Sequence, residues 1–547
     1  MDGLMMDWPL LVPSILRRAS RIYPEKQIVS RWADGSIHRM TYGDLEPRVH
    51  RLMNALRGLG IGPGDRVATL AWNSHRHLEL YFAVPSIGAV LHTINFRLAR
   101  EQLRYIVHHA KDRLLFVDKS VAALAAAMQP ELPGVEHYII MDDRCPEPPA
   151  RPGPSIDYEE LLASSSERAE FPDLDEKQAA GMCYTSATTG DPKGVVYSHR
   201  SKFLHAMAGC LVDAGGLSER ETTLPAVPMF HVNAWGIPYS AAMTGAKIVL
   251  PGSGLLGQPL AEILESERVT TAAGVPTIWN LLYQHLKEKT YDLSSLHTLL
   301  VGGSAVSRAM IENFQHDFGI RVLHAWGMTE TSPLGTVSEL RGAMRSWPEQ
   351  KQLEFRLKQG VPPIGVEIRI LGDDGQDLPW DGEQVGELAV RGPWIASSYY
   401  ENPSAGAAFT DDGWFRTGDM ASIDQYGYVQ LRDRKKDLIK RKGEWISSVD
   451  MENEIVGHPG VAEAAVVARP DPVNDEQPAV LVVRAPGAGP VEPQEIVDRL
   501  AKKFARWQLP LPEDIHFVDA LPKTGVGKID KKVLRRQLAG GPEPGGN

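Results

Sequence analysis

Short apolar runs alternate with helix-period segments along most of this chain, and this alternation limits the folds that it can adopt. Short apolar runs bounded by turn residues are typical of buried strands, and apolar residues three and four positions apart are typical of helices packed on a sheet. The predicted strands are residues 67–72, 114–117, 138–141, 247–250 and 299–301, and the predicted helices are residues 101–110, 121–128, 260–267 and 307–318. In the last helix, Met310, Ile311 and Phe314 share one face. The pattern predicts an α/β fold of layered sheets and helices.

The length of 547 residues is more than one hydrophobic core usually holds, so at least two domains are expected. The pattern changes near residues 433–436. Beyond this point the predicted helices are residues 450–456 and 494–504, and the predicted strands are residues 464–467 and 480–483. We therefore expect a large N-terminal domain (1–433), a small mobile α+β C-terminal domain (434–538) and a disordered tail rich in glycine and proline (539–547).

Composition excludes several classes of protein. The formal net charge of −11 argues against a general nucleic-acid binder. Cys145, Cys183 and Cys210 match neither a disulfide framework nor a zinc site. The N-terminus lacks the basic start and apolar core of a secretion signal, and no run approaches the ~20 apolar residues that span a bilayer. We expect a cytoplasmic enzyme without stable membrane insertion.

The strongest local signal is the string YTSATTGDPKG at residues 184–194. Hydroxyls, glycines and a lysine lie between the apolar run 179–183 and a predicted helix that starts near Ser198. Hydroxyl and backbone N–H groups can surround phosphate oxygens, and lysine adds a compact positive charge. The string is not a Walker loop, because GxxxxGK[ST] is absent. A solvated turn is the alternative for a shorter Ser/Thr/Gly loop, but the complete string favours phosphate binding.

The string resembles the phosphate loop of the adenylate-forming superfamily, which includes acyl-CoA synthetases, nonribosomal adenylation domains and luciferases. The family pattern is [ST]-[SG]-G-[ST]-[TS]-G-x-P-K-G, and this chain departs from it at Ala187, which replaces the first glycine. Unlike glycine, alanine tolerates positive φ poorly. The resemblance covers nearly the whole chain, from about Ser14 to Leu538. The ATP-binding residues that it implies here are Thr185, Ser186, Ala187, Thr188, Thr189, Gly190 and Lys193.

Two further motifs fall in the family's order. Residues 302–304 follow the predicted strand 299–301, and in relatives this turn borders the adenine and the acyl carboxylate. The string AWGMTE at residues 325–330 resembles the family's YGxTE. The resemblance implies that Trp326 stacks on adenine, that Thr329 binds phosphate, and that Glu330 and Thr185 hold Mg²⁺. The implied nucleotide-binding residues are Gly302, Gly303, Ser304, Ala325, Trp326, Gly327 and Met328.

Three motifs near the C-terminus complete the resemblance. WFRTGD at residues 414–419 matches W[FY]xTGD, which implies that Asp419 accepts hydrogen bonds from the ribose hydroxyls. DRKKD at residues 433–437 implies that Arg434 also reaches the ribose and that Lys436 is the hinge between two poses of the C-terminal domain. PKTGVGK at residues 522–528 implies that Lys528 is the catalytic lysine, with Lys523 as its nearest rival.

The string PMFHVNAW at residues 228–235 bears on the acid. Amino-acid-activating relatives place an aspartate where this chain has His231, so an ammonium group is disfavoured. Trp235 resembles the aromatic gate of fatty acyl-CoA synthetases, and the substrate pocket is assigned to His231, Trp235, Gly303 and Pro333. Lys528, Glu330, Thr329 and His231 are the predicted catalytic residues.

The resemblance is nearest to medium- and long-chain fatty acyl-CoA synthetases and 3-(methylthio)propionyl-CoA ligases. It implies an acid–thiol ligase that uses ATP, Mg²⁺ and coenzyme A, passes through an acyl-adenylate, and forms a homodimer. Short-to-medium chain acids or 3-(methylthio)propionate rank first, and long-chain fatty acids or aryl acids are the alternative.

Other classes of protein remain open at this point. GxGxxG at residues 252–257 is the dinucleotide fingerprint, but Pro259 follows it at once, so an NAD oxidoreductase is disfavoured. The GxSxG motif of a serine hydrolase is not completed after Ser304. A luciferase-like enzyme and a nucleotide-binding module are remote alternatives, and the presence of Glu330 and Lys528 disfavours the module.

Overall fold

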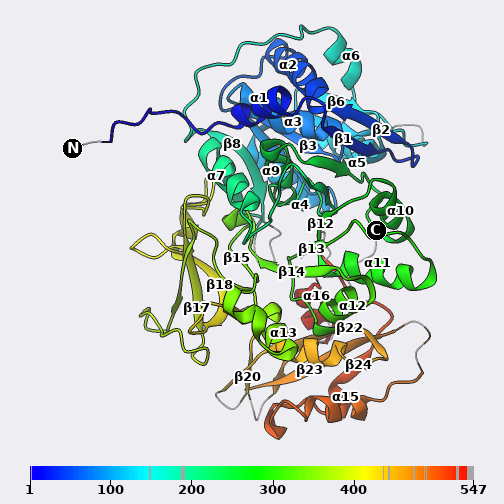
Figure 1. The fold of residues 1–547 in the computed structure, drawn as a ribbon, viewed down its shortest axis with the longest axis vertical. Coiled ribbons are helices and arrows are strands. Elements are labelled where there is room, and N and C mark those ends of the chain that lie inside the picture. Colours follow the sequence, from blue (N-terminus) through cyan, green and yellow to red (C-terminus); the bar gives the residue numbers. More distant parts are fainter. Residues whose placement is uncertain are drawn as a thin grey trace.

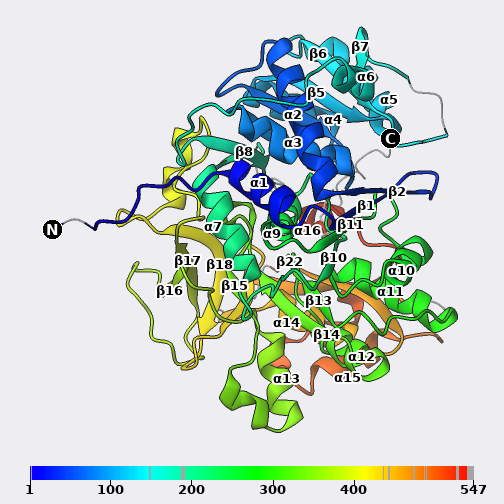
Figure 2. The same ribbon diagram turned by 45° about the horizontal axis from the view of Figure 1, so that its top comes forward.

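The computed structural model describes residues 1, 3–146, 150–185, 191–434, 436–441, 444–471, 475–485, 487, 489–524 and 529–538. Within these residues the strands form four sheets, with helices layered between and around them (Figures 1 and 2). No helix in this part of the chain is both long enough and apolar enough to cross a membrane. The predicted α/β fold class is confirmed.

Two large, mostly parallel sheets form the N-terminal part of the chain. The seven-stranded sheet has the order β7-β6-β5-β3-β4-β8-β9 and comprises β3 (Arg66–Leu70), β4 (Val90–Thr93), β5 (Asp112–Asp118), β6 (His137–Met141), β7 (Ser155–Asp157), β8 (Ala179–Tyr184) and β9 (Gly194–Ser198). The eight-stranded sheet has the order β15-β14-β13-β12-β10-β11-β1-β2 and comprises β1 (Gln27–Arg31), β2 (Ile37–Thr41), β10 (Thr222–Pro225), β11 (Lys247–Leu250), β12 (Thr271–Gly274), β13 (Thr298–Val301), β14 (Arg321–Trp326) and β15 (Thr336–Val337). Their central strands are almost entirely buried, as expected for parallel sheets covered on both faces.

Helix α3 (His75–Ser86) shows how the two sheets are layered. All of its residues are buried, because it packs against β4 and β8 of one sheet and β1 of the other. A helix with no solvent-facing side is typical of an internal layer. Ser74 begins the helix, and its side chain accepts a hydrogen bond from the backbone N–H of His77.

The remaining helices of the N-terminal part cover the outer faces or lie between the sheets (Figure 1). They are α1 (Val12–Ile22), α2 (Tyr42–Gly58), α4 (Arg100–Ala110), α5 (Ala122–Met128), α6 (Tyr158–Ala163), α7 (His199–Cys210), α8 (Val232–Trp235), α9 (Ile237–Thr244), α10 (Gly257–Ser266), α11 (Pro276–Glu288), α12 (Arg308–Phe318) and α13 (Glu349–Leu357). In α12, Met310, Ile311 and Phe314 are buried, which confirms the predicted face.

A smaller antiparallel sheet and a C-terminal unit complete the fold. The four-stranded sheet runs in sequence order through β16 (Glu367–Leu371), β17 (Gly386–Arg391), β18 (Phe415–Ile423) and β19 (Val429–Arg434). The C-terminal sheet comprises β20 (Ile439–Arg441), β21 (Glu444–Ile446), β22 (Val461–Asp471), β23 (Asp475–Arg484) and β24 (Ile515–Phe517), and its helices are α14 (Ser448–Val456), α15 (Pro493–Leu500) and α16 (Lys531–Leu538). Figure 1 shows this unit, in orange and red, at the end of the molecule opposite the seven-stranded sheet.

The predicted elements are confirmed, with shifted ends. Every strand and helix predicted from the alternation overlaps an observed element of the same type. The predicted helix 494–504 ends at Leu500. The sequence prediction missed β9, which pairs antiparallel with β8.

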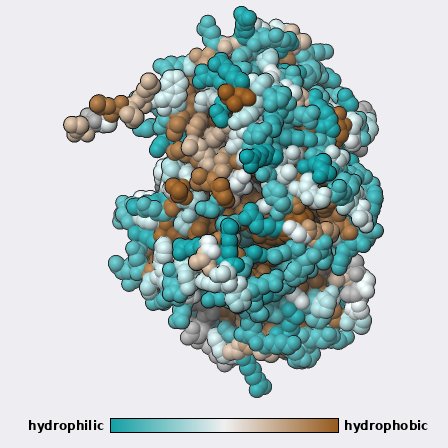
Figure 3. Space-filling model, viewed as in Figure 1, coloured by the Kyte–Doolittle hydropathy of each residue, from teal (hydrophilic) through white to brown (hydrophobic). Residues whose placement is uncertain are grey.

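Figure 3 shows that the surface on the viewed side is largely hydrophilic, with apolar residues gathered left of centre and across the middle of the molecule. The N-terminal segment that extends from the body is an exception, because Leu4, Met5, Met6 and Trp8 are exposed.

A buried ion pair between α2 and α3 gives a test of the packing. Arg48 Nε donates to Glu79 Oε1 at 2.6 Å, and the Glu79 side chain has no exposed surface. Because Arg48→Met leaves a buried carboxylate without its partner, we expect the free energy of unfolding to fall by about 3 kcal/mol or more. Urea denaturation measures this loss.

Arg51 lies on the same helix and is the matched control. It pairs with Glu167 at the surface, so Arg51→Met is expected to cost less than about 1 kcal/mol. Equal losses in the two variants would contradict the packing described for α2 and α3.

Candidate active site

One large cleft of ≈ 1870 Å³ lies between the N-terminal sheets and the C-terminal unit. All the predicted site residues that the structure describes line it. They are Thr185, Lys193, His231, Trp235, Gly302, Gly303, Ser304, Ala325, Trp326, Gly327, Met328, Thr329, Glu330, Pro333, Asp419, Arg434 and Lys436. The predicted residues Ser186, Ala187, Thr188, Thr189, Gly190 and Lys528 lie outside the described residues.

Neighbouring parallel strands bring two of the motifs together. β13 and β14 are adjacent, so residues 302–304 and 327–330 emerge from the same edge of the eight-stranded sheet. Ligands bind at such carboxyl edges in α/β folds. Gly327 is required by close packing, because a Cβ at this position would lie 1.3 Å from the carbonyl oxygen of Pro333. The backbone of residues 327–333 therefore folds tightly back beside the cleft.

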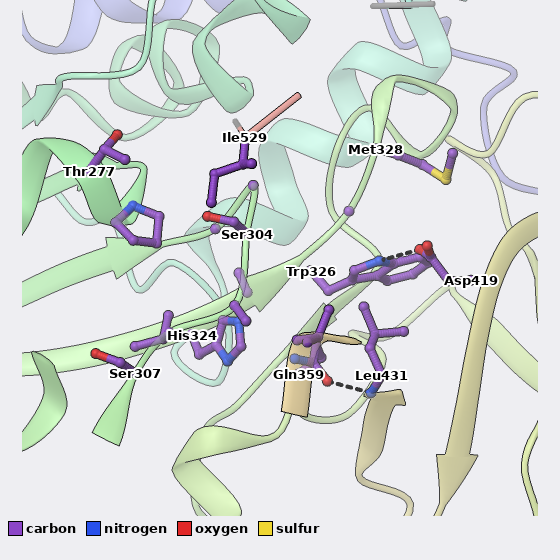
Figure 4. A pocket seen from close by; sticks show the side chains of 18 of the residues that line it. Thr277, Ser304, Ser307, His324, Trp326, Met328, Gln359, Asp419, Leu431 and Ile529 are labelled. Atoms are coloured by element: carbon purple, nitrogen blue, oxygen red, sulfur yellow. Dashed lines mark hydrogen bonds between the residues drawn. The ribbon is translucent and has the colours of Figure 1, made fainter. Parts of the chain in front are cut away.

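Asp419 connects the eight-stranded sheet to the four-stranded sheet. Its side chain is almost completely buried, and its Oδ2 accepts a hydrogen bond from Trp326 Nε1 at 2.9 Å (Figure 4). Its Oδ1 pairs with Arg434 Nε at 2.5 Å across the β18–β19 ladder. The carboxylate thus holds the indole and the guanidinium in fixed places at the edge of the cleft.

Glu330 is a buried carboxylate in the segment that follows β14. Its Oε1 accepts a hydrogen bond from the Tyr399 hydroxyl at 2.6 Å. Burial raises the pKa of Glu330, although the Tyr399 hydroxyl partly opposes this shift. Next to it, the backbone oxygen of Thr329 accepts from the Tyr197 hydroxyl at 2.8 Å. The Thr329–Glu330 segment is thus held by two tyrosines, one that precedes it in the chain and one that follows it.

Thr185 and Lys193, which belong to the predicted phosphate loop, lie at the ends of the paired strands β8 and β9. The backbone N–H of Thr185 donates to the Lys193 oxygen at 2.9 Å, and the N–H of Lys193 donates to Thr185 Oγ1 at 3.1 Å. The Lys193 ammonium lies 4.7 Å from the centre of the Tyr399 ring. Lys193 and Glu330 are therefore both anchored by Tyr399.

Apolar side chains line the part of the cleft around Trp235, which we call its apolar end and which borders α7, α8 and β13. Trp235 lies close to Gly302, where an added Cβ would be 3.3 Å from Trp235 Cη2. His231 precedes α8, and Leu300, Leu334 and Ile237 also line this end. The cleft therefore joins a polar end, around Asp419 and Glu330, to an apolar end around Trp235.

The C-terminal unit forms the opposite wall. Ile529, labelled in Figure 4, and Thr524 flank residues 525–528 and line the cleft. Lys523, the rival for the catalytic role, also lines the cleft but pairs with Glu463 at 2.7 Å. Asp433 links this unit to the four-stranded sheet, because its Oδ2 accepts a hydrogen bond from the backbone N–H of Ser448 at 2.7 Å.

Sequence reasoning missed three polar residues at the site. Tyr399 anchors both Glu330 and Lys193, but its surroundings in sequence match no motif that we identified. Lys202 and Asn233 form a buried hydrogen bond next to Trp235. Lys202 carried no signal, because α7 has no apolar stripe that would mark the positions of His199, Lys202 and His205 as its buried face.

Comparison with known proteins identifies the family of this chain. The model of the AMP-binding enzyme family matches residues 16–400, and that of the AMP-binding enzyme C-terminal domain matches residues 450–528. The chain is 45% identical over 539 residues to the 3-methylmercaptopropionyl-CoA ligase of Ruegeria lacuscaerulensis, covering 98% of this chain and 99% of the relative. It is 45% identical over 535 residues to the long-chain-fatty-acid–CoA ligase of Thermus thermophilus, covering 97% and 96%.

Among solved structures, the anthranilate CoA ligase AuaEII in complex with anthranoyl-AMP matches with a TM-score of 0.85 at 25% identity, covering 98% of this chain and 99% of that one. The chain belongs to the AMP-binding enzyme family, which confirms the predicted adenylate-forming superfamily. The predicted class, an AMP-forming acid–CoA ligase with ATP and CoA as substrates, is confirmed with it.

The Trp326–Asp419 hydrogen bond generates a prediction. Trp326→Phe keeps a ring at the cleft but removes the N–H that donates to Asp419. Since a hydrogen bond to a charged group contributes about 1.5–3 kcal/mol, we expect the KM for ATP to rise about tenfold or more. Steady-state kinetics with varied ATP measures this effect.

Trp414→Phe is the matched control. Trp414 immediately precedes β18, but its ring packs against the guanidinium groups of Arg369 and Arg391. Its replacement should leave the KM for ATP unchanged. An unchanged KM in Trp326→Phe would show that the Asp419 contact does not support nucleotide binding.

Proposed function

We propose that this ligase activates short-to-medium chain carboxylic acids, with 3-(methylthio)propionate as the first candidate. The observation that carries this proposal is the large cleft, in which buried carboxylates lie near Asp419 and Glu330 and the Trp235 ring lies against Gly302 among apolar residues. An acid fits this cleft with its carboxylate toward the polar end and its chain among the apolar residues. Each buried CH₂ contributes about 0.8 kcal/mol, so the depth of the apolar end selects chain length.

The polar end is assigned to ATP. In this proposal Asp419 and Arg434 bind the ribose, Trp326 contacts the adenine, and Thr329 contacts phosphate. The turn at 302–304 borders both the adenine and the carboxylate. Residues 185–190 and Lys193 surround the phosphates. The geometry supports these roles because the Asp419 contacts hold Trp326 and Arg434 on the same side of the cleft.

Mg²⁺ is proposed to bind through Glu330 and Thr185 together with phosphate oxygens of ATP. No cluster of three or more His, Cys, Asp or Glu side chains suitable for a metal occurs among the residues that the structure describes. Magnesium needs only one or two carboxylates when a nucleotide supplies further oxygens. The donor set of one carboxylate and one hydroxyl therefore fits this metal.

The attack on the α-phosphorus is assigned to the carboxylate of the acid, with pyrophosphate as leaving group. In this proposal Lys528 neutralises the charge that develops in the transition state, and CoA sulfur then displaces AMP. Residues 434–538 act as a lid that turns about Lys436 between the two half-reactions. His231 and Pro333, which both line the cleft, contact the acid.

We also propose a homodimer in the cytoplasm. The exposed apolar residues of the N-terminal segment support association between copies. The three cysteines are free, which suits a reducing compartment.

A thioester assay with CoA, MgATP and a panel of acids tests the proposed substrate. The panel holds 3-(methylthio)propionate, saturated acids of three to sixteen carbons, aryl acids and amino acids. We expect the highest kcat/KM among the short-to-medium acids and the thioether acid. A best rate on an aryl or amino acid would overturn the substrate assignment.

Long-chain acids are the second candidate. In this proposal they enter the cleft when the Trp235 ring leaves its place against Gly302. Trp235→Ala removes this wall and should move the preferred acid toward longer chains. An unchanged preference in this variant would contradict the role of Trp235, and a wild-type optimum at sixteen carbons would favour the long-chain assignment.

A further inference from the structure

The turn that carries Trp235 has an unusual backbone. Val232, Asn233, Ala234 and Trp235 have φ values of 46°, 51°, 48° and 56°, so four successive residues other than glycine are left-handed. Each such residue brings its Cβ close to the following carbonyl, which costs free energy. Strained backbone of this kind persists only where the surroundings hold it.

Asn233 is the tethered residue of this turn. Its side chain is buried, and its Oδ1 accepts a hydrogen bond from Lys202 Nζ of α7 at 2.6 Å. Its Nδ2 donates to Thr93 Oγ1 at the end of β4 at 3.3 Å. The left-handed turn is therefore fastened to a helix and to a strand of the seven-stranded sheet.

Lys202 is a buried cation in neutral surroundings. Within the described residues no carboxylate lies within ion-pair distance of its ammonium, which instead lies 5.0 Å from the ring centres of Tyr197 and Tyr239. Burial lowers the pKa of Lys202 to about 8. A buried charge without an ionic partner destabilises the folded chain. Stability therefore does not explain why a lysine occupies position 202.

Helix α1 also packs against α7, and its arginines, Arg17, Arg18 and Arg21, are exposed or partly exposed. The buried titratable groups around Lys202 come from the other elements near it. They are Cys183 of β8, Tyr197 of β9, Tyr81 of α3, Tyr239 of α9 and His199 and His205 of α7. Burial raises the pKa values of the thiol and the phenols, and it lowers those of His199 and His205 to about 4 and about 3. All of these groups are neutral near pH 7, so Lys202 is the one that titrates just above it.

The turn positions two of the residues that line the cleft where the acid is proposed to bind. His231 precedes Asn233 by two residues and Trp235 follows it by two, and both line the cleft. The Trp235 ring lies against the backbone of Gly302. A change in the backbone of residues 232–235 would move the indole away from this wall.

We propose that Lys202 is a positioning residue for the acid: its hydrogen bond to Asn233 holds the left-handed turn, and the turn holds the Trp235 indole against Gly302. This inference rests on the proposed assignment of the apolar end of the cleft to the acid. It adds to that assignment a residue of α7 that does not line the cleft and acts only through Asn233.

Lys202→Met tests the role directly. Methionine keeps a long, unbranched and buried side chain but lacks the terminal nitrogen, so it cannot donate to Asn233. Because a hydrogen bond from a charged donor is lost, the KM for the acid should rise about tenfold, while the KM for ATP stays within about twofold. The melting temperature should change little, because the removal of a buried charge offsets the loss of the hydrogen bond to the buried Asn233 oxygen.

A second substitution separates positioning from packing. Glycine adopts left-handed φ freely, so Ala234→Gly favours the turn without the Lys202 contact. Glycine removes the backbone cost of the left-handed conformation at position 234. The double variant Lys202→Met/Ala234→Gly should therefore have a KM for the acid within about threefold of that of the Ala234→Gly single variant. Loss of packing or of charge alone would not be rescued in this way.

The pH dependence supplies a third readout. As pH rises from 7 to 9 Lys202 loses its charge, and a neutral amine is a weaker donor than an ammonium. The KM for the acid should therefore rise over this range in the wild type, and this rise should be absent in Lys202→Met.

The proposal is overturned if Lys202→Met leaves the KM for the acid unchanged, raises the KM for ATP equally, or is not rescued by Ala234→Gly. These outcomes presuppose a wild-type enzyme that ligates an acid. A wild-type enzyme that ligates no acid would overturn the proposed function and this inference with it. Failure of this inference alone leaves the wild-type enzyme active, so the two failures are distinguishable.

Discussion

The carboxylate of Asp419 is the contact on which the geometry of this site depends. It is buried, it accepts from Trp326 at the end of β14, and it pairs with Arg434 at the end of β19. Two sheets of different topology thus meet at one charged group. A buried carboxylate is costly unless it is paired and hydrogen-bonded, and here both partners also line the cleft. The same contacts that compensate its burial therefore fix the wall of the site.

The rest of the cleft is built by tyrosines, buried amides and glycines around parallel strand ends. Tyr399 holds Glu330 and Lys193, and Tyr197 holds the backbone of Thr329 while its ring lies beside Lys202. These contacts form a layer that runs from Tyr399 through the Thr329–Glu330 segment and Tyr197 to Lys202 of α7. Preorganised polar groups of this kind suit a reaction in which charge develops on a phosphoryl group. The layer also links the proposed nucleotide end to the turn that carries Trp235.

The strands and helices were predicted from local patterns, and the residues of the cleft from motifs that resemble those of a known family. The strand 299–301 and the turn 302–304 were visible as an apolar run followed by glycines, and β13 with Gly302 bears this out. The motif around Asp419 was visible as a string, but its buried contact with Trp326 spans 93 positions and leaves no periodic signal. The left-handed turn at 232–235 was also invisible, because no residue in it except Asn233 favours that conformation.

The central claim is that a carboxylic acid attacks the α-phosphorus of ATP in this cleft. Exchange of labelled pyrophosphate into ATP, measured without CoA, tests it most directly. The account predicts exchange that requires both an acid and Mg²⁺ and that falls by about 10²–10³ in Lys528→Ala. Exchange that is absent with every acid tested, or that is as fast without acid, would contradict it.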